Sequence, residues 1–354
     1  MNEVMRDEIL DQPEALRQTL PSLRHQLPSL ISEAKDAERV IFTGSGDSYF
    51  APLALEYAAR RQLPMDVFVL PSQMAARYWP FSSRDLLVAI SISGEAARTV
   101  EAARAARKSE ASVLAVTVNQ SSTLANLSTA TLSIPFRSRS RQTPHTTDYL
   151  TTLLTISAII EFLGNYRFSV LDVLPDMVSH SVQALEGPCS DIGRALKQME
   201  HFYFLGTGPS FGTAHYAAAK FWEVGGLRAF HFELEEFGHG PHMLVAPGDP
   251  IFVIAPGGQS SDRASLTVAS LNLIGARSFV ITENTELFSD AQVLHTPPLD
   301  EEWSPFGTCL SVQWLCWAVA TAKGYDVVAK NSLAANPKLY EQAHRQLIRS
   351  SSSV

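Results

Sequence analysis

The chain has 354 residues, 45% hydrophobic and 18% charged, which is enough for about two domains with packed cores. Its formal net charge of -8 argues against a nucleic-acid partner, because nucleic acid attracts basic surfaces. No apolar run reaches the ~18 residues of a membrane span, and the acidic N-terminus does not resemble a signal peptide.

The cysteine spacing argues against disulfide bonds and metal sites. Cys189, Cys309 and Cys316 form neither a CxxC pair nor a metal-ligand spacing. We therefore expect no disulfide framework, no metal and a cytoplasmic location, where thiols stay reduced.

Residues 1–30 are predicted to form an N-terminal helical arm, and residues 31–187 a first domain. In this domain, short β-branched runs alternate with helical segments of roughly 10–15 residues, which is typical of a parallel sheet covered by helices. We place the domain boundary near Glu186–Pro188. A second domain follows over 188–345, and a tail over 346–354.

Two hydroxyl-rich turns follow apolar runs in the first domain. Gly44–Ser48 reads Gly-Ser-Gly-Asp-Ser, and Ser91–Gly94 reads Ser-Ile-Ser-Gly. Glycines let the backbone approach an anion, and a helix N-terminus offers free N–H groups. Ligands of such sheets bind beyond the carboxyl ends of the strands, so the two turns are predicted to meet at one phosphate. The alternative for Gly44–Ser48 is an ordinary strand-to-helix turn capped by Ser48.

The predicted phosphate site therefore uses neutral donors. It is neither a dinucleotide fingerprint nor a P-loop, and we expect no cofactor. The candidate residues are Gly46, Ser48, Ser91, Ser93, Gly94 and Thr99.

The second half of the chain repeats the first. Phe202–Phe204 precede Gly206–Ser210, which is again G-x-G-x-S, and Ile251–Ala255 precede the turn Pro256–Ser261. The repeat predicts an α/β fold of two tandem, doubly wound parallel sheets, as in flavodoxin-like proteins. Because the second turn has lost its serine pattern at Pro256–Gln259, the two copies are predicted to be unequal.

One helical segment and one loop of the second half carry candidate catalytic groups. Lys220 and Glu223 are spaced i,i+3 in an apolar helix, and His239 lies in a glycine-rich loop. A carboxylate and a histidine suit proton transfer. The alternatives are a helix-stabilising ion pair and an ordinary loop histidine.

These motifs, in this order, resemble the tandem SIS (sugar isomerase) family, especially the isomerase half of glucosamine-6-phosphate synthase. The resemblance covers nearly the whole chain. The matching elements are the entry segment Met5–Pro13, Gly46 with Ser48-Tyr49, Ser91-x-Ser93-Gly94-Glu95, Lys220-x-x-Glu223 and His239-Gly240-Pro241.

The resemblance implies roles for the catalytic candidates. Glu223 would shuttle a proton between C1 and C2 of an open-chain sugar phosphate, and Lys220 would balance the developing negative charge. His239 would take part in ring opening from the partner subunit of a homodimer.

The chain also departs from the family pattern. We expect no glutaminase domain, since the first cysteine is Cys189. Ala96 stands where the family has threonine, and the "S-T-K" element falls near His145–Thr147 without a lysine. The family's C-terminal lysine has no clean match: Ala335 falls near it, and Lys338 is the nearest substitute. We therefore expect an isomerase or deaminase of an amino-sugar 6-phosphate. The alternatives are a fructosamine-6-phosphate deglycase and a phosphosugar-binding protein without turnover.

Overall fold

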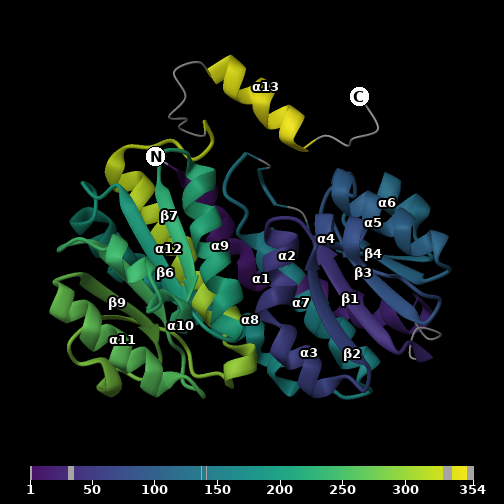
Figure 1. Cartoon of the computed structure of the whole chain (residues 1–354), viewed down its shortest axis with the longest axis horizontal. Coiled ribbons are helices and arrows are strands. Elements are labelled where there is room, and N and C mark those ends of the chain that lie inside the picture. Colours follow the sequence, from purple (N-terminus) through teal and green to yellow (C-terminus); the bar gives the residue numbers. More distant parts are fainter. Residues whose placement is uncertain (1, 31–35, 137, 141, 330–336, 349–354) are drawn as a thin grey trace.

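The computed structural model describes residues 2–30, 36–136, 138–140, 142–329 and 337–348. Its core is a pair of five-stranded parallel sheets that lie side by side, with helices between and around them (Figure 1). The first sheet has the order β2-β1-β3-β4-β5, and the second, taken from its other edge, has the order β7-β6-β8-β9-β10. The two orders are the same, so the predicted tandem α/β repeat is confirmed.

The central strands of the first sheet are buried on both faces, which explains why they are nearly continuous apolar runs. Its strands are β1 (Arg39–Gly44), β2 (Asp66–Pro71), β3 (Asp85–Ile90), β4 (Ser112–Thr117) and β5 (Ala130–Ser133). The helices of this half are α1 (Glu3–Leu30), α2 (Asp47–Ala54), α3 (Glu56–Gln62), α4 (Ser72–Tyr78), α5 (Ala97–Lys108), α6 (Thr123–Leu127), α7 (Thr147–Leu163) and α8 (Ser169–Ala195).

The second half follows the same plan. Its strands are β6 (His201–Gly206), β7 (Arg228–Glu233), β8 (Pro250–Ile254), β9 (Arg277–Thr282) and β10 (Gln292–His295). Its helices are α9 (Pro209–Val224), α10 (Leu234–Phe237), α11 (Ser261–Ile274), α12 (Pro305–Lys323) and α13 (Pro337–Ile348), with the short 3-10 helices η2 (Pro241–Leu244), η3 (Glu286–Phe288) and η4 (Glu301–Trp303).

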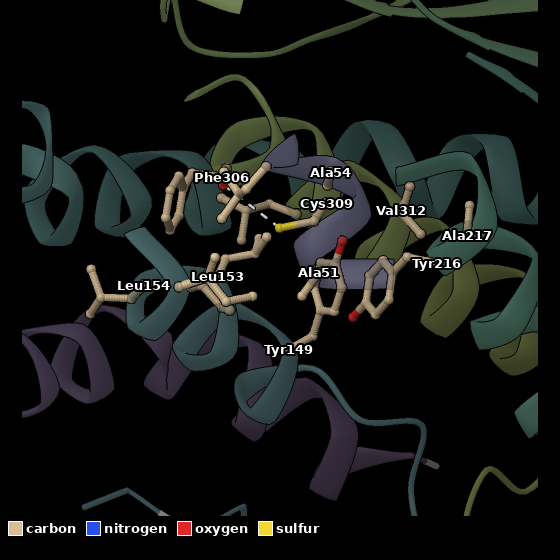
Figure 2. Close-up of a cluster of buried hydrophobic side chains, with 14 of the residues drawn as sticks. Ala51, Ala54, Tyr149, Leu153, Leu154, Tyr216, Ala217, Phe306, Cys309 and Val312 are labelled. Atoms are coloured by element: carbon tan, nitrogen blue, oxygen red, sulfur yellow. Dashed lines mark hydrogen bonds between the residues drawn. The ribbon is translucent and has the colours of Figure 1, made fainter. Parts of the chain in front are cut away.

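Four helices, α2, α7, α9 and α12, join the two sheets through a shared apolar core (Figure 2). At its centre the rings of Tyr149 and Tyr216 stack with centroids 3.6 Å apart, and both are fully buried. The α2–α9 contact is close because Gly212 has no side chain: a Cβ there would lie 2.3 Å from the backbone N of Ala54. This approach brings the end of α9 to the start of α2.

The predicted arm is a single helix, α1, which packs against α7 and α8 with Leu16 and Leu23 buried. The predicted boundary at Glu186–Pro188 lies inside α8, not in a loop, and the division into residues 31–187 and 188–345 stays a prediction. Residues 31–35, Ala335 and residues 349–354 lie outside the described ranges. Among the described helices, none combines the length and apolar character needed to cross a membrane.

Candidate functional site

A cavity of about 300 Å³ lies beyond the carboxyl ends of β1 and β3. It brings together both predicted turns, the start of α7 and the end of α9, which come from distant parts of the sequence. Of the predicted site residues, Gly46, Ser48, Ser91, Ser93 and Glu223 line it. The remaining lining residues are Ser45, Asp47, Ile92, Ala96, His145, Asp148 and Thr152.

The first turn takes a backbone conformation that requires glycine. Gly46 has φ 59° and ψ -132°, where a side chain would be strained, and α2 begins at the next residue. The carbonyl of Gly46 accepts hydrogen bonds from the N–H groups of Tyr49 and Phe50. The first turn of α2 and the Ser48 side chain therefore face the cavity at the end of the helix that favours an anion.

The second turn is held by its own serines. The Ser91 Oγ accepts hydrogen bonds from the N–H groups of Gly94 at 3.1 Å and Ala96 at 3.4 Å, and the Ser93 Oγ accepts one from Glu95 at 3.2 Å. Because both hydroxyl oxygens act as acceptors in the turn, each hydroxyl hydrogen remains to be donated to a ligand. The two side chains can therefore serve the turn and an anion together.

Two predicted phosphate ligands are not brought to the cavity wall. Thr99 is fully buried, and its Oγ1 lies 2.8 Å from the Ser72 Oγ, because the first turn of α5 packs against α4. The N–H of Gly94 is bonded within its turn to the carbonyl of Ser91 and the Ser91 Oγ. In this arrangement both residues hold the turn and its surroundings and do not face the ligand.

The predicted pair of Lys220 and Glu223 is part of a three-residue cluster. The Lys220 Nζ lies 2.6 Å from the Asp47 Oδ2 and 2.7 Å from the Glu223 Oε2, and the lysine side chain is fully buried. Its ammonium also lies 4.9 Å from the ring centroid of Tyr216. Lys220 is therefore not at the cavity surface: it holds Glu223, which is 31% exposed, and it ties α9 to the first turn.

The charges of this cluster depend on one another. Burial lowers the pKa of Lys220, but the carboxylates of Asp47 and Glu223 outweigh it, and the net shift is upward. Burial raises the pKa of Asp47 to about 6, with Lys220 opposing the shift and Glu223 adding to it. Removing Lys220 would leave two partly buried carboxylates side by side without their cation.

A histidine that sequence reasoning did not select stands on the cavity wall. His145 lies just before α7, and its Nδ1 is 3.2 Å from the Asp148 Oδ2. Its backbone N–H donates to the Glu223 Oε2 at 3.3 Å, and its carbonyl accepts a hydrogen bond from the Tyr216 hydroxyl at 2.9 Å. Both backbone groups are thus held by α9, so the position of His145 relative to Glu223 is defined.

The predicted catalytic His239 lies elsewhere. Its side chain is 68% exposed, and its Nε2 is 3.3 Å from the Glu235 Oε1 on α10. It does not line the cavity of its own chain. The prediction that it acts from a partner subunit is not tested by a single chain and stays a prediction.

The chain matches the SIS domain family twice, over residues 33–161 and 195–319. It belongs to the SIS domain family. The two matches contain the two sheets, so the repeated sheet order and the repeated family match describe the same duplication.

Two kinds of relatives support this assignment. The glutamine–fructose-6-phosphate aminotransferase of Sulfurisphaera tokodaii is 29% identical over 337 residues, which cover 92% of this chain and 55% of the relative. The chain thus spans about half the length of the curated relatives it matches.

The solved structures show the fold. The C-terminal domain of glucosamine-fructose-6-phosphate aminotransferase from Francisella tularensis superposes with a TM-score of 0.83 at 22% identity, covering 92% of this chain and 98% of that one. Glucosamine-6-phosphate deaminase from Thermotoga maritima superposes with a TM-score of 0.74 at 21% identity, covering 92% and 97%.

The second SIS domain carries its own version of the two turns. Gly208 has φ 55° and ψ -132°, nearly the values of Gly46. Here the N–H of Gln259 donates to the Glu301 Oε2 at 3.0 Å, and a Cβ on Gly258 would lie 2.2 Å from the Glu301 Cδ. A carboxylate of the protein therefore lies against the turn that corresponds to Ser91–Gly94, and we assign no phosphate to it.

Sequence reasoning missed the three ionisable cavity residues Asp47, His145 and Asp148. Asp47 is inside the predicted first turn, and its place as the first residue of α2 was a usable signal. His145 and Asp148 are spaced i,i+3 at the position where the family has its "S-T-K" element. A histidine and a carboxylate stand there in place of the lysine, and these residue types are the signal that could have found them.

Proposed function

We propose that this protein moves a proton between C1 and C2 of an open-chain amino-sugar 6-phosphate, as an isomerase or deaminase. The observation that carries the proposal is the position of Glu223. Its carboxylate lines the same 300 Å³ cavity as Ser48, Ser91 and Ser93. A phosphosugar bound through its phosphate to the serine turns would extend its carbon chain toward this carboxylate.

Glu223 is suited to act as the base. Lys220 and the N–H of His145 both contact its Oε2, so we assign proton abstraction to Oε1. Since the lysine is buried behind Glu223, we assign it the role of positioning residue and not that of direct contact with the enolate.

The chemistry needs no cofactor. Glu223 takes the proton from C2 of the open-chain amino aldose, and the C1 carbonyl oxygen gains a proton to give an enolamine. Return of the proton to C1 gives a ketose imine, and addition of water followed by loss of ammonia gives the ketose phosphate. With a hydroxyl in place of the amine, the same proton transfer interconverts an aldose and a ketose phosphate.

The charge of the cavity supports an amino substituent. Three carboxylates line it, from Asp47, Asp148 and Glu223, and the nearest lysine is already shared between two of them. A protonated amine would be attracted to the carboxylates of Asp148 and Glu223, while the serine turns offer neutral donors to the phosphate. The deaminase of Thermotoga maritima, which shares the fold, is named for such a substrate.

The test is to incubate the protein with glucosamine 6-phosphate, hexose 6-phosphates and fructosamine 6-phosphates. Ammonia, ketose phosphate and free amino acid report deaminase, isomerase and deglycase activity respectively, and NMR in D₂O reports exchange at C2. We expect ammonia or ketose phosphate, and a roughly thousandfold slower reaction for Glu223→Gln. The control is Glu186→Gln, since Glu186 pairs with Arg6 and does not line the cavity.

Two outcomes would contradict this proposal. Full activity in Glu223→Gln would remove the assigned base. Tight binding of a phosphosugar with no turnover on the whole panel would favour the binding protein without activity.

We further propose a homodimer in which His239 approaches the cavity of the partner. The exposure of His239 and its place outside the cavity of its own chain support this arrangement. Mixed dimers of Glu223→Gln and His239→Gln should recover activity that neither variant has alone, because one of the two sites then holds both native residues. No recovery after subunit exchange would argue for sites built from one chain.

A further inference from the structure

We propose that Glu8, on the N-terminal helix α1, is a positioning residue of the cavity, because it holds the segment that places a backbone N–H on Glu223. We call Ser140 and residues 142–146, which lie between β5 and α7, the pre-α7 segment. The inference rests on the proposed function, since Glu223 is the assigned base. It gives a role to the entry segment Met5–Pro13, which is described throughout and does not line the cavity.

Glu8 accepts three hydrogen bonds from the pre-α7 segment and the residue that follows it. The Glu8 Oε1 accepts one from the N–H of Ser140 at 2.9 Å, and the Oε2 accepts one from the Thr143 hydroxyl at 3.1 Å. The Glu8 carbonyl accepts the third from the hydroxyl of Thr147, the first residue of α7, at 3.0 Å. Glu8 is only 1% exposed, and a buried carboxylate is costly without such partners. Helix α1 and the pre-α7 segment therefore hold each other in place.

The pre-α7 segment in turn contacts the assigned base. His145 donates its backbone N–H to the Glu223 Oε2 at 3.3 Å, and Lys220 lies 2.7 Å from the same oxygen. These two contacts restrain the carboxylate and leave its Oε1 for proton transfer. A reacting group must be held in its productive geometry by the residues behind it. Glu8 therefore acts on the base through the pre-α7 segment and does not touch the substrate.

A residue one turn further along α1 reaches the same segment indirectly. The Gln12 Nε2 donates to the Gln313 Oε1 at 2.8 Å, and both side chains are buried. Gln313 donates to the Tyr216 hydroxyl at 3.1 Å and to the carbonyl of Thr146 at 3.4 Å, and the Tyr216 hydroxyl donates to the carbonyl of His145 at 2.9 Å. Because this second route remains, loss of the direct link should loosen the pre-α7 segment without unfolding the chain.

Two substitutions of Glu8 separate its hydrogen bonds from its charge. Glu8→Ala removes both side-chain links. Glu8→Gln keeps them, because the amide oxygen accepts from the N–H of Ser140 and the amide N–H donates to the Thr143 hydroxyl. If the links are what matters, the glutamine variant should behave like the wild type.

The first measurement follows the pre-α7 segment itself. Hydrogen–deuterium exchange with mass spectrometry reports the peptides that contain the amides of Ser140 and His145. We expect Glu8→Ala to speed exchange in these peptides about tenfold, which corresponds to the loss of one hydrogen bond. Glu8→Gln should stay within about threefold of the wild type.

The second measurement is steady-state kinetics with glucosamine 6-phosphate. We expect Glu8→Ala to lower kcat about thirtyfold, because the base is less well oriented, and to change KM less than about threefold. KM should change little because Ser48, Ser91 and Ser93, which offer donors to the phosphate, lie on other elements. Glu8→Gln should restore kcat. A purely structural defect would instead lower kcat in proportion to the folded fraction, which circular dichroism measures.

The matched control is Glu14→Ala on the same helix. Glu14 is 60% exposed and pairs with Arg17, so both exchange and kcat should stay at wild-type values. If Glu8→Ala does not fold, Thr143→Val removes one of the two links with little change in volume, and we expect about a threefold loss of kcat.

The outcomes separate this inference from the proposed function. A folded Glu8→Ala with wild-type exchange in the pre-α7 segment overturns the inference, as does faster exchange there with unchanged kcat. An equal loss of kcat in Glu8→Gln also overturns it, since the links are then not the cause. If the wild type turns over no phosphosugar, the proposed function fails, while faster exchange in Glu8→Ala and not in Glu14→Ala supports the hold of α1 on the cavity wall.

Discussion

The two SIS domains share a sheet order and a turn conformation but differ in what their turns can hold. Gly46 and Gly208 have almost the same φ and ψ, and each starts a helix. In the first domain, Asp47 follows the glycine and Ser91 and Ser93 supply the second turn. In the second, Pro209 follows the glycine.

The second turns differ more. The first domain keeps an open wall of serine hydroxyls, whereas the second places the Glu301 carboxylate against the Gln259 N–H. The two copies therefore share the scaffold, while their side chains leave a serine-lined cavity in the first and place the Glu301 carboxylate against the turn of the second. The second domain contributes through Lys220 and Glu223, which reach the turn of the first.

The largest effect should come from breaking this link between the domains. Lys220→Met leaves Asp47 and Glu223 facing each other without their cation, and we expect the free energy of unfolding to fall by about 3 kcal/mol. Urea unfolding followed by circular dichroism measures it. The control Arg17→Met removes an exposed ion pair with Asp176 and should cost less than about 1 kcal/mol. Equal losses would show that the cluster does not link the domains.

A smaller effect should distinguish the two domains by their affinity for a phosphosugar. Ser48→Ala removes a hydroxyl from the first cavity, and we expect the affinity for glucose 6-phosphate to fall about tenfold, or about 1.4 kcal/mol. Ser260→Ala removes a hydroxyl from the second turn of the second domain and should leave the affinity unchanged. Isothermal titration calorimetry measures both affinities. A lower affinity in Ser260→Ala would indicate that the phosphate binds in the second domain.

A weaker effect on phosphate binding should appear when the Glu301 carboxylate is removed from the second turn of the second domain. Glu301→Ala frees the N–H of Gln259, and we expect an additional, roughly millimolar site for inorganic phosphate. Phosphorus NMR titration counts the sites. Asp300→Ala removes the same charge from the same cavity wall without freeing this N–H, and it should add no site. An added site in Asp300→Ala would mean that charge alone excludes phosphate.

The smallest effect concerns a pair of histidines in the second domain, His215 and His231, whose rings are in contact. Burial, aided by His231 at a ring-centroid distance of 3.7 Å, lowers the pKa of His215 to about 3. A lowered pKa favours the neutral ring in the folded state, so stability is full above pH 6.5 and is lost as the pH falls toward 3. His215→Phe should lower the midpoint pH of acid unfolding, because phenylalanine takes up no proton.

The first domain should respond in the opposite direction. His145 has a raised pKa, so its contribution to stability is present below pH 6.5 and is lost as the pH rises through its folded value.

The control for the acid midpoint of His215→Phe is His180→Phe at an exposed position of α8, which should leave the midpoint unchanged. An unchanged midpoint in His215→Phe would show that the rings of His215 and His231 separate before the protein unfolds.

Much of the fold and part of the site could be predicted from local patterns. The apolar runs before Gly44 and Gly206 mark strands, and the glycines mark turns at strand ends. These signals involve neighbouring residues, so they do not depend on how the domains meet. Together with the family resemblance they selected Gly46, Ser48, Ser91, Ser93 and Glu223, which line one cavity, while the roles of these residues stay predictions.

By itself, then, the sequence determined the duplicated α/β scaffold, the serine turns and the paired spacing of Lys220 and Glu223. The tertiary structure decided what those groups meet. Lys220 contacts Asp47 across 173 positions of the chain because α9 packs closely on α2 at Gly212. His145 reaches Glu223, and Thr99 turns toward Ser72, for the same reason: helix packing sets which side chains share a cavity, and no local pattern records it.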